Sequence, residues 1–352
     1  SNNYLGFTHA PEVIEAASRA ALKFGTGSSG SRLTTGGTFI ASELEKRLAD
    51  FKHSESALVF NTGYMTNLGV LYGLLQTGDV VFSDELNHAS IIDGCRISRG
   101  KVVVYKHNDM ADLQRLLETE IVTGQRFIVT DGVFSMDGDI ADLPSLAVLK
   151  KQFNAFLIVD DAHGVGVIGN DGSGTASHYG LTDVIDLQVG TLSKALAAEG
   201  GYVAGKKILI DYLINRSRPF IFSTALAPAT LAAANAALLL LQTQASKYLD
   251  SLRANSRLMR RLLLEGGLNV VEGITPIIPV VIGEAGLTMQ FADRLKSKGI
   301  LVSGIRPPTV PRGESRLRIT VTAAHCEEQL RQAAQIITAL WQELKHGEKK
   351  EG

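Results

Sequence analysis

Two short motifs carry groups whose types and spacing could do chemistry together. The first is Val-Asp-Asp-Ala-His-Gly at 159–164, and the second is Thr-Leu-Ser-Lys at 191–194. Two consecutive acids at the end of an apolar strand are costly to bury unless a cation faces one of them. A protonated pyridine ring is such a cation, and an aspartate beside its nitrogen keeps it protonated as an electron sink. Asp160 and Lys194 therefore indicate the chemistry of pyridoxal phosphate (PLP).

The surroundings of Lys194 differ from those of an ordinary surface lysine. It lies between an apolar segment at 184–189 and a run of small residues at 195–201. Small residues let a planar ring approach, and burial disfavours the charged ammonium. The hydroxyls of Thr191 and Ser193 could bind a phosphate. A metal site is the alternative for the two acids and His163, but they lack a further histidine in a fixed register.

A second phosphate-binding element is predicted at residues 61–67. This segment follows an apolar strand and opens a helix, and Gly63 stands where free backbone N–H groups would face an anion. Tyr64 is expected to pack near the phosphate. The alternative is an ordinary turn between a strand and a helix. The hydroxyls near Lys194 favour the phosphate site.

Two further residues follow strands and could face the same site. His88 begins a predicted helix, where a histidine is usually a cap or a surface residue, but its ring could instead stack on a cofactor ring. Ser135 lies in a loop after a buried strand and is either a turn serine or a cofactor ligand. Farther along, Arg318 alternates with an apolar neighbour on a buried strand, so it needs an anion. A substrate carboxylate would fit its guanidinium group.

The segment 25–30 matches the G-x-G-x-x-G pattern of dinucleotide-binding proteins, but its context is wrong. A helix precedes it and a Thr/Gly-rich loop follows it, whereas a dinucleotide site needs a strand before and a helix after. We therefore expect a loop that approaches an active site or a subunit boundary.

Bulk composition excludes several classes of protein. The 352 residues are 45% hydrophobic and 20% charged, with a net charge of −1, so no strong attraction to nucleic acid or to a membrane surface is expected. The sequence contains no apolar run of membrane-spanning length and no signal peptide. Cys95 and Cys326 have no metal-ligand neighbours, and we expect reduced thiols in a cytoplasmic protein.

The order of apolar patterns predicts an α/β protein with a mostly parallel seven-stranded sheet. Its strands are expected at 57–60, 79–83, 101–105, 127–130, 156–160, 184–189 and 202–204, mostly buried on both faces. Crossover helices are expected at 65–75, 88–98 and 143–151. A smaller α+β domain follows, with helices at 229–241, 252–264, 287–298 and 327–344 and strands at 277–282 and 316–321. The domains are predicted as an N-terminal segment at 1–40, a large PLP-binding domain at 41–235 and a small domain at 236–352.

With these residues assembled, nearly the whole chain resembles the α-oxoamine synthase family of PLP enzymes. The resemblance rests on Asp-Gly-Val-Phe-Ser-Met-Asp-Gly-Asp at 131–139, on the two motifs above and on Thr-Ala-Ala-His at 322–325. It implies fold type I, the aspartate aminotransferase fold. Ile-Arg-Pro-Pro-Thr-Val-Pro at 305–311 most resembles the biotin-pathway branch, which condenses L-alanine with pimeloyl-CoA or pimeloyl-acyl carrier protein. That branch implies a cytoplasmic homodimer with shared active sites, without nucleic-acid or membrane partners.

The resemblance also implies a role for each matched residue. Lys194 would carry PLP covalently, Asp160 would pair with its ring nitrogen, and His163 would contact its phenolate oxygen. His88 would stack on the ring and contact substrate. The remaining cofactor ligands would be Gly63, Tyr64, Ser135, Thr191 and, reaching the partner's phosphate, Ser223 or Thr224. The substrate ligands would be Asn2, Arg306, Thr309 and Arg318.

The sequence departs from the family pattern at three places. Ala41 replaces a common histidine, Ala197 replaces a usual glycine, and Ser1 opens the sequence without the family's N-terminal arm, which leaves the acyl-chain selectivity open. Three alternative functions follow: a glycine C-acetyltransferase or another α-oxoamine synthase, a PLP transaminase, or a non-catalytic subunit. The presence of Lys194 disfavours the last of these.

Overall fold

The computed structural model describes the backbone of residues 1–351 and the side chains as far as Lys345. The chain forms two compact units, which we call the large unit and the small unit. The large unit comprises Gly6–Phe134 and Ile140–Ser246. The small unit combines Ser1–Leu5 and Ser135–Asp139 with the chain from Lys247 onward. The sequence predicted a boundary at 235/236, whereas the structure divides the units at Ser246/Lys247.

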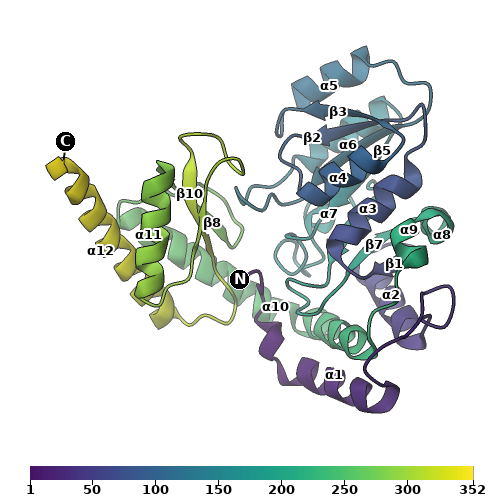
Figure 1. Ribbon diagram of the computed structural model, residues 1–352, viewed down its shortest axis with the longest axis horizontal. Helices are drawn as coiled ribbons and strands as arrows, with labels where there is room; N and C mark the ends of the chain where they lie inside the picture. The colour runs from purple at the N-terminus through teal and green to yellow at the C-terminus, as the bar shows by residue number, and fades with distance from the viewer. Residues whose placement is uncertain (352) are drawn as a thin grey trace. The chain divides into compact units, whose positions relative to one another are not determined.

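The large unit is built on a seven-stranded sheet with the order β1-β7-β6-β5-β4-β2-β3 (Figure 1). Five neighbouring strands, from β6 to β3, run parallel, while β7 is antiparallel to both β1 and β6. The strands are β1 (Ser56–Phe60), β2 (Val80–Asp84), β3 (Lys101–Tyr105), β4 (Arg126–Asp131), β5 (Ala155–Asp160), β6 (Leu187–Thr191) and β7 (Gly201–Gly205).

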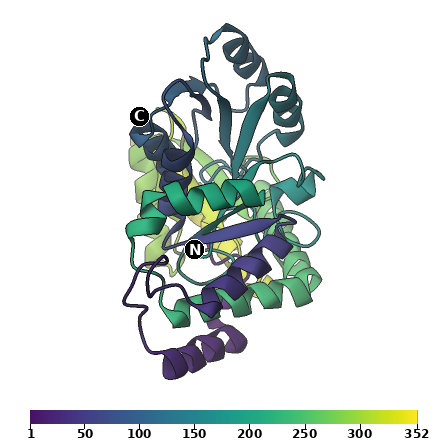
Figure 2. The ribbon, with the colours of Figure 1, turned by 90° about the vertical axis from the view of Figure 1, so that its right-hand side faces the viewer.

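Helices cover both faces of this sheet (Figures 1 and 2). One apolar cluster joins the sheet to α3, α4, α8 and α9, and a second joins it to α5, α6 and α7. The helices of the large unit are α1 (Pro11–Phe24), α2 (Phe39–Phe51), α3 (Gly63–Leu74), α4 (Ala89–Ile97), α5 (Met110–Thr119), α6 (Leu143–Gln152), α7 (Thr175–His178), α8 (Lys207–Arg216) and α9 (Arg218–Phe222), with a 3-10 turn η1 (Phe7–His9) before them.

The register of the parallel strands brings three polar residues together at the carboxyl ends of the strands. Asp131 at the end of β4 is the partner of Asp160 at the end of β5, and Asp160 is the partner of Val189 on β6. Thr191 follows as the last residue of β6. Carboxyl ends of parallel strands are where open α/β sheets bind ligands. The predicted site therefore lies where the fold type requires it.

One strand is an exception to the burial expected of most strands, and another begins later than predicted. Strand β3 is the sheet edge, and its Val104 side chain is 58% exposed, so this strand is not buried on both faces. Strand β6 begins at Leu187 rather than at 184, because the preceding residues form a turn in which Asp186 accepts a hydrogen bond from Leu157 N (2.7 Å). Edge position and turn geometry are tertiary properties that apolar runs do not report.

The two predicted helices at 229–241 and 252–264 are joined in the structure. Helix α10 (Pro228–Glu265) runs through both, with a kink at Gln244, whose φ of −131° is not helical. The unit boundary at Ser246/Lys247 falls just after this kink.

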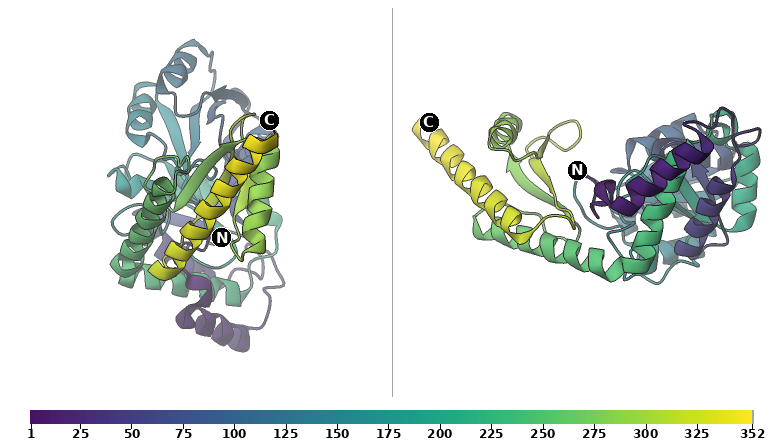
Figure 3. Two further views of the ribbon diagram at one scale, coloured as in Figure 1. Left: turned by 90° about the vertical axis from the view of Figure 1, so that its left-hand side faces the viewer. Right: turned by 90° about the horizontal axis from the view of Figure 1, so that it is seen from below.

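The small unit contains a three-stranded antiparallel sheet with the order β8-β10-β9. Its strands are β8 (Ile277–Gly283), β9 (Ser303–Ile305) and β10 (Ser315–Thr320). Helices α11 (Ala285–Ser297) and α12 (Glu327–Glu351) lie side by side (Figure 3). The rings of Phe291 and Trp341 stack between them with centroids 5.7 Å apart. Across the described residues of both units, no helix combines the length and apolarity needed to span a bilayer.

Candidate active site

The two adjacent acids at the end of β5 have different partners. Asp161 forms a fully buried ion pair with Lys52 (Nζ–Oδ2 3.0 Å) and accepts hydrogen bonds from Thr175 N and Oγ1 (both 2.9 Å). Asp160 is also buried, but its bonds come from neutral donors, Asn67 Nδ2 (2.6 Å) and Ala162 N (3.0 Å). Within the described chain no ion pair reaches Asp160. A buried carboxylate without a cation fits the pyridine N–H of PLP.

Lys194 and His163 lie in direct contact. The Lys194 Nζ atom is 2.8 Å from His163 Nε2, although the two residues come from the separate loops that follow β6 and β5. The turn after the lysine is held by a bond from Ala198 N to Leu192 O (2.9 Å). Both Lys194 and Asp160 act electrostatically on His88 and on Asp131, so the predicted catalytic groups share one neighbourhood.

The two predicted phosphate elements also meet. A Cβ atom added to Gly63, the first residue of α3, would lie 3.2 Å from the Thr191 side chain, so the helix start and the end of β6 approach closely. Thr191 Oγ1 lies 2.8 Å from Ser193 Oγ, and Thr62 caps the helix by accepting from Met65 N (3.0 Å). Free helix N–H groups beside two hydroxyls can hold a phosphate. These residues therefore fit the phosphate of PLP.

Tyr64 and the segment at 223–224 lie around this element. Tyr64 is 42% exposed and its hydroxyl donates to Asp93 on α4, which raises the pKa of the phenol. Thr224 O accepts from Asn61 Nδ2 (2.7 Å), just before α3, while Ser223 precedes it at the end of α9. The Gly-rich loop at 25–30 packs on the same segment, because Ser28 Oγ donates to Ala225 O (2.6 Å). No strand precedes this loop, so it has no dinucleotide-binding context.

His88 is the N-cap of α4, with its backbone N donating to Asp131 Oδ2 (2.9 Å). Burial lowers the pKa of the His88 imidazole, the Asp160 charge opposes this shift, and Lys194 adds to it. Burial, followed by the charge of Asp160, raises the pKa of the Asp131 carboxyl well above its usual range. Burial thus disfavours the charged forms of both the His88 imidazole and the Asp131 carboxyl, which lie beside Asp160.

The predicted substrate residues Asn2 and Arg318 meet in the small unit. Arg318 donates from Nη2 to Asn2 Oδ1 (3.3 Å), from Nη1 to Thr320 Oγ1 (3.0 Å) and from Nε to the carbonyl of Ser135. All three partners are neutral, and no acid pairs with Arg318 in the described residues. Its neighbour Arg316 is buried and pairs with Asp137 and Glu314. Arg316 is therefore already neutralised, whereas no described acid neutralises the charge of Arg318, and the role of Arg318 in binding a substrate carboxylate stays a prediction.

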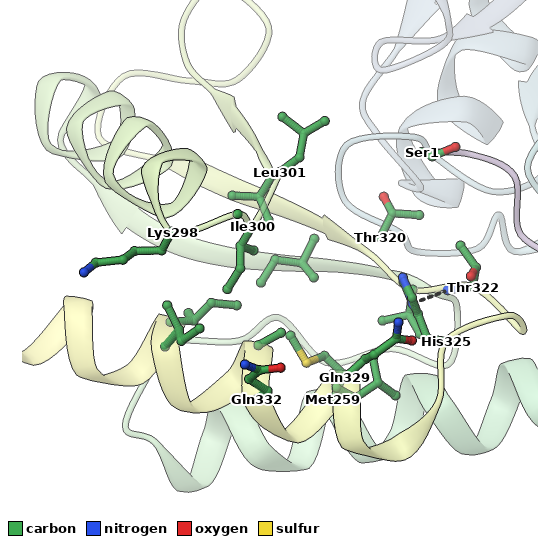
Figure 4. Close-up of a pocket in the computed structure, with 18 of the residues that line it drawn as sticks. Ser1, Met259, Lys298, Ile300, Leu301, Thr320, Thr322, His325, Gln329 and Gln332 are labelled. Atoms are coloured by element: carbon green, nitrogen blue, oxygen red, sulfur yellow. Dashed lines mark hydrogen bonds between the residues drawn. The ribbon is translucent and has the colours of Figure 1, made fainter.

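Arg306 and Thr309 belong to one exposed turn between β9 and β10, where Thr309 N donates to Arg306 O (3.1 Å). No hydrogen bond in the described chain joins this turn to Asn2 or Arg318, and Arg306 and Arg318 line different cavities. The small unit also contains a cavity of about 560 Å³ beside β10, which this turn does not line. The cavity extends from Lys298 to Ser1, and Arg318 forms part of its wall (Figure 4).

Replacing Arg318 by alanine is expected to raise the KM for the amino-acid substrate about 10- to 100-fold, because charged hydrogen bonds to a carboxylate contribute about 1.5–3 kcal/mol. The KM for the acyl thioester should change little. Steady-state kinetics with each substrate varied in turn will measure both. The matched control is Arg316→Ala, which should lower thermal stability instead. A larger effect of Arg318→Ala on the thioester KM would contradict the assignment.

Ala197 occupies a strained backbone position. Its φ is +53°, in the left-handed region that favours glycine, the residue that the family resemblance led us to expect there. We expect Ala197→Gly to increase the free energy of unfolding by about 0.5–1 kcal/mol. Urea denaturation will test this against Ala195→Gly, at a buried position outside the left-handed region, which should destabilise the protein. Equal destabilisation by both variants would rule out the strain.

Three polar residues at the site were not assigned from the sequence. Asn67 on α3 and Ser90 on α4 are fully buried and hydrogen-bonded to each other (2.9 Å), and Asp131 contacts His88. A polar Asn67 within an otherwise apolar helix was a usable signal, since buried polar groups need partners. Ser90 gave no such signal.

The chain is similar to known proteins over almost its whole length. Residues 1–337 match the family described as aminotransferase class I and II. An 8-amino-7-oxononanoate synthase of Lysinibacillus sphaericus is 50% identical over 330 residues, which cover 94% of this chain and 85% of that protein. The 8-amino-7-oxononanoate synthase 1 of Bacillus subtilis strain 168 is 47% identical over 98% of this chain and 88% of its own length.

Solved structures agree with these sequence matches. A structure of serine palmitoyltransferase (SPT) with a PLP internal aldimine superposes with a TM-score of 0.95 at 32% identity, over 98% of this chain and 87% of that one. The 8-amino-7-oxononanoate synthase of Francisella tularensis has a TM-score of 0.82 at 30% identity, over 99% and 97% of the two chains.

Proposed function

The chain belongs to the class I and II aminotransferase family, on the branch of the 8-amino-7-oxononanoate synthases, and we propose that it performs their PLP-dependent reaction. In that reaction L-alanine condenses with a pimeloyl thioester to give 8-amino-7-oxononanoate, CO2 and a free thiol, as a step of biotin biosynthesis. The α carbon of alanine bonds to the thioester carbonyl carbon. The C–S bond and the bond to the alanine carboxylate break.

One observation carries the proposal: Asp160, buried and bonded only to neutral donors, shares its neighbours His88 and Asp131 with Lys194. An amine and an unpaired buried carboxylate are the two groups that PLP needs at opposite ends of its ring. The alternative acid, Asp161, is committed to Lys52. This supports Asp160, rather than Asp161, as the partner of the ring nitrogen.

The residues of the chain then divide the work. Bound PLP supplies an electron sink for the negative charge left on the substrate α carbon. Lys194 removes the α proton at its Nζ, which lies against His163. Asp160 would accept a hydrogen bond from the ring nitrogen of bound PLP and so keep that nitrogen protonated. Gly63 and Thr191 hold the phosphate, and Arg318 with Asn2 binds the alanine carboxylate.

We further propose that two copies of the chain share their active sites. Apolar side chains in the large unit support a subunit interface: Phe222 is 68% exposed, and Phe39 is 62% exposed beside Phe24. Ser223 and Thr224 follow Phe222 directly and would reach the partner's phosphate. Sedimentation of the holoenzyme tests this, because a monomer at working concentration would contradict it.

The free thiols of Cys95 and Cys326 support a cytoplasmic location.

The decisive experiment measures CO2 and thiol release with four substrate pairs. L-Alanine and glycine are each combined with pimeloyl and acetyl thioesters of CoA, and pimeloyl-acyl carrier protein is added as a second donor. Stoichiometric CO2 and thiol from alanine with a pimeloyl donor is the expected result. Preference for glycine with acetyl-CoA would indicate a glycine C-acetyltransferase. A keto acid without CO2 or thiol would indicate a transaminase.

A further inference from the structure

A continuous chain of buried hydrogen bonds connects Asp160 to His88 through two residues with no assigned role. Asn67 uses its Nδ2 group twice, donating to Asp160 Oδ2 (2.6 Å) and to Ser90 Oγ (2.9 Å). Ser90 Oγ in turn lies 2.8 Å from His88 Nδ1. Asn67 and Ser90 are 2% and 1% exposed, so water does not compete for these bonds.

The direction of the last bond is fixed by a backbone group. Ser90 N also points to His88 Nδ1, at 3.3 Å, and a backbone N–H can only donate. His88 Nδ1 must therefore accept, which means that it carries no proton. The Ser90 hydroxyl, which accepts from Asn67, then places its own hydrogen on the same ring nitrogen. In the neutral imidazole the proton is left on Nε2.

We propose that Asn67 and Ser90 are positioning residues that lock His88 in the neutral form with its proton on Nε2 and tie that state to the orientation of the Asp160 carboxylate. Protonation of Nδ1 would break the bond from Ser90 Oγ–H and set an N–H against the Ser90 backbone N–H. The locked form therefore resists becoming an imidazolium, even beside a carboxylate.

The groups that face His88 from other elements are consistent with this state. Asp131 at the end of β4 accepts a hydrogen bond from the His88 backbone N rather than from its ring, and burial raises the pKa of the Asp131 carboxyl, which disfavours its charged form. Asp160 favours the imidazolium, whereas burial and Lys194 oppose it. The hydrogen bonds from Ser90 act in the same direction as burial.

The consequence for catalysis, which rests on the proposed function, is that His88 and Lys194 have different roles. His88 serves as a neutral ring face and as an N–H donor at Nε2. It does not exchange protons with substrate, because Nδ1 is occupied by two donors. Proton transfer at the substrate α carbon stays with Lys194.

The direct test is nitrogen-15 NMR of the holoenzyme labelled at histidine, with the His88 signals identified by their loss in His88→Gln. We expect an unprotonated Nδ1 and a protonated Nε2 near neutral pH. In Ser90→Ala the pKa of His88 should rise by about half a pH unit or more, because a hydrogen bond to the neutral form is lost. The acid limb of the kcat/KM profile should move to higher pH by the same amount. Ser98→Ala, which removes a hydroxyl bonded to Cys95 O at the other end of α4, should change neither signal nor profile.

The role of Asn67 is tested by a double-variant cycle. Asn67→Ala should shift the acid limb in the same direction as Ser90→Ala, and the double variant should shift it little further, since one chain is broken once. A proton on Nδ1 in the wild type, an unchanged profile in Ser90→Ala or fully additive shifts would each overturn the proposal. The NMR measurement needs no substrate. If it gives the expected form while alanine yields no CO2, the proposed function fails and the locked histidine stands.

Discussion

Replacing Lys194 by alanine is expected to lower turnover by about 10³-fold or more and to remove the visible absorbance band of lysine-bound PLP. The variant loses both the covalent attachment and the base at the substrate α carbon. Its fold should survive, because Lys194 is only half-buried and its side chain meets His163 in the loops that follow the strands. Absorbance spectra of the purified protein with added PLP, together with CO2 release, measure the two losses.

The matched control for this variant is Lys52→Ala. Lys52 also lies near the carboxyl end of β5, but it is buried against Asp161 and donates to Ser173 O. Loss of a buried ion-pair partner costs about 3–5 kcal/mol of stability, so this control should unfold more easily while its folded fraction binds PLP. Wild-type turnover in Lys194→Ala would refute the assignment of the catalytic amine.

Replacing Asp160 by asparagine is expected to lower kcat by about 10²–10³-fold while PLP binding persists. The phosphate cradle at Gly63 and Thr191 and the amine of Lys194 remain, so the cofactor still binds. The charge that keeps a proton at the ring nitrogen is gone, and the cofactor becomes a poorer electron sink. Bound PLP, measured by absorbance after gel filtration, and kcat with alanine together test this.

The adjacent acid provides the comparison. Asp161→Asn should weaken the buried contact with Lys52 and lower the thermal midpoint, whereas Asp160→Asn should leave the midpoint nearly unchanged. If Asp161→Asn instead abolished turnover at full stability, the ring nitrogen would belong to Asp161. The two variants differ by one position in sequence, so their separation is a stringent test of the geometry.

Much of the large unit was predictable because its strands are short, apolar and nearly continuous. The strand at 101–105 was predicted with both ends correct, and those at 57–60 and 156–160 within one residue. Asp160 and Lys194 were found because each motif places a chemically unusual group beside a buried strand. The apolar pattern could not reveal that β3 is an edge, since edge position depends on which strands pair.

The parts of the site that escaped prediction depend on contacts between distant segments. The family resemblance named Asp160 rather than Asp161 as the partner of a ring nitrogen. Nothing in the sequence indicated Lys52, whose ion pair with Asp161 supports that prediction and which lies more than a hundred positions away from Asp161. The expected packing of Tyr64 near a phosphate stays a prediction, and the sequence did not indicate that its hydroxyl bonds to Asp93 on the next helix. The hydrogen bond between Asn67 and Ser90 likewise joins two helices. Asn67 was a signal that some partner exists, but nothing in the sequence identified Ser90 as that partner.

The small unit consists of three segments that lie far apart in the sequence, so it can finish folding only after the last of them has been synthesised. Ser1–Leu5 and Ser135–Asp139 belong to it but are synthesised long before Lys247 and the strands that follow. Asp137 cannot form its ion pair until Arg316 has been synthesised. Tyr4 O likewise cannot accept its hydrogen bond from Ala323 N (2.7 Å) until that residue has been added. A fragment starting at Lys247 would keep Arg316 buried without Asp137. Because the chain is synthesised from its N-terminus, this unit is the last to finish folding. A fragment that contains only the C-terminal third of the chain would therefore lack part of the unit.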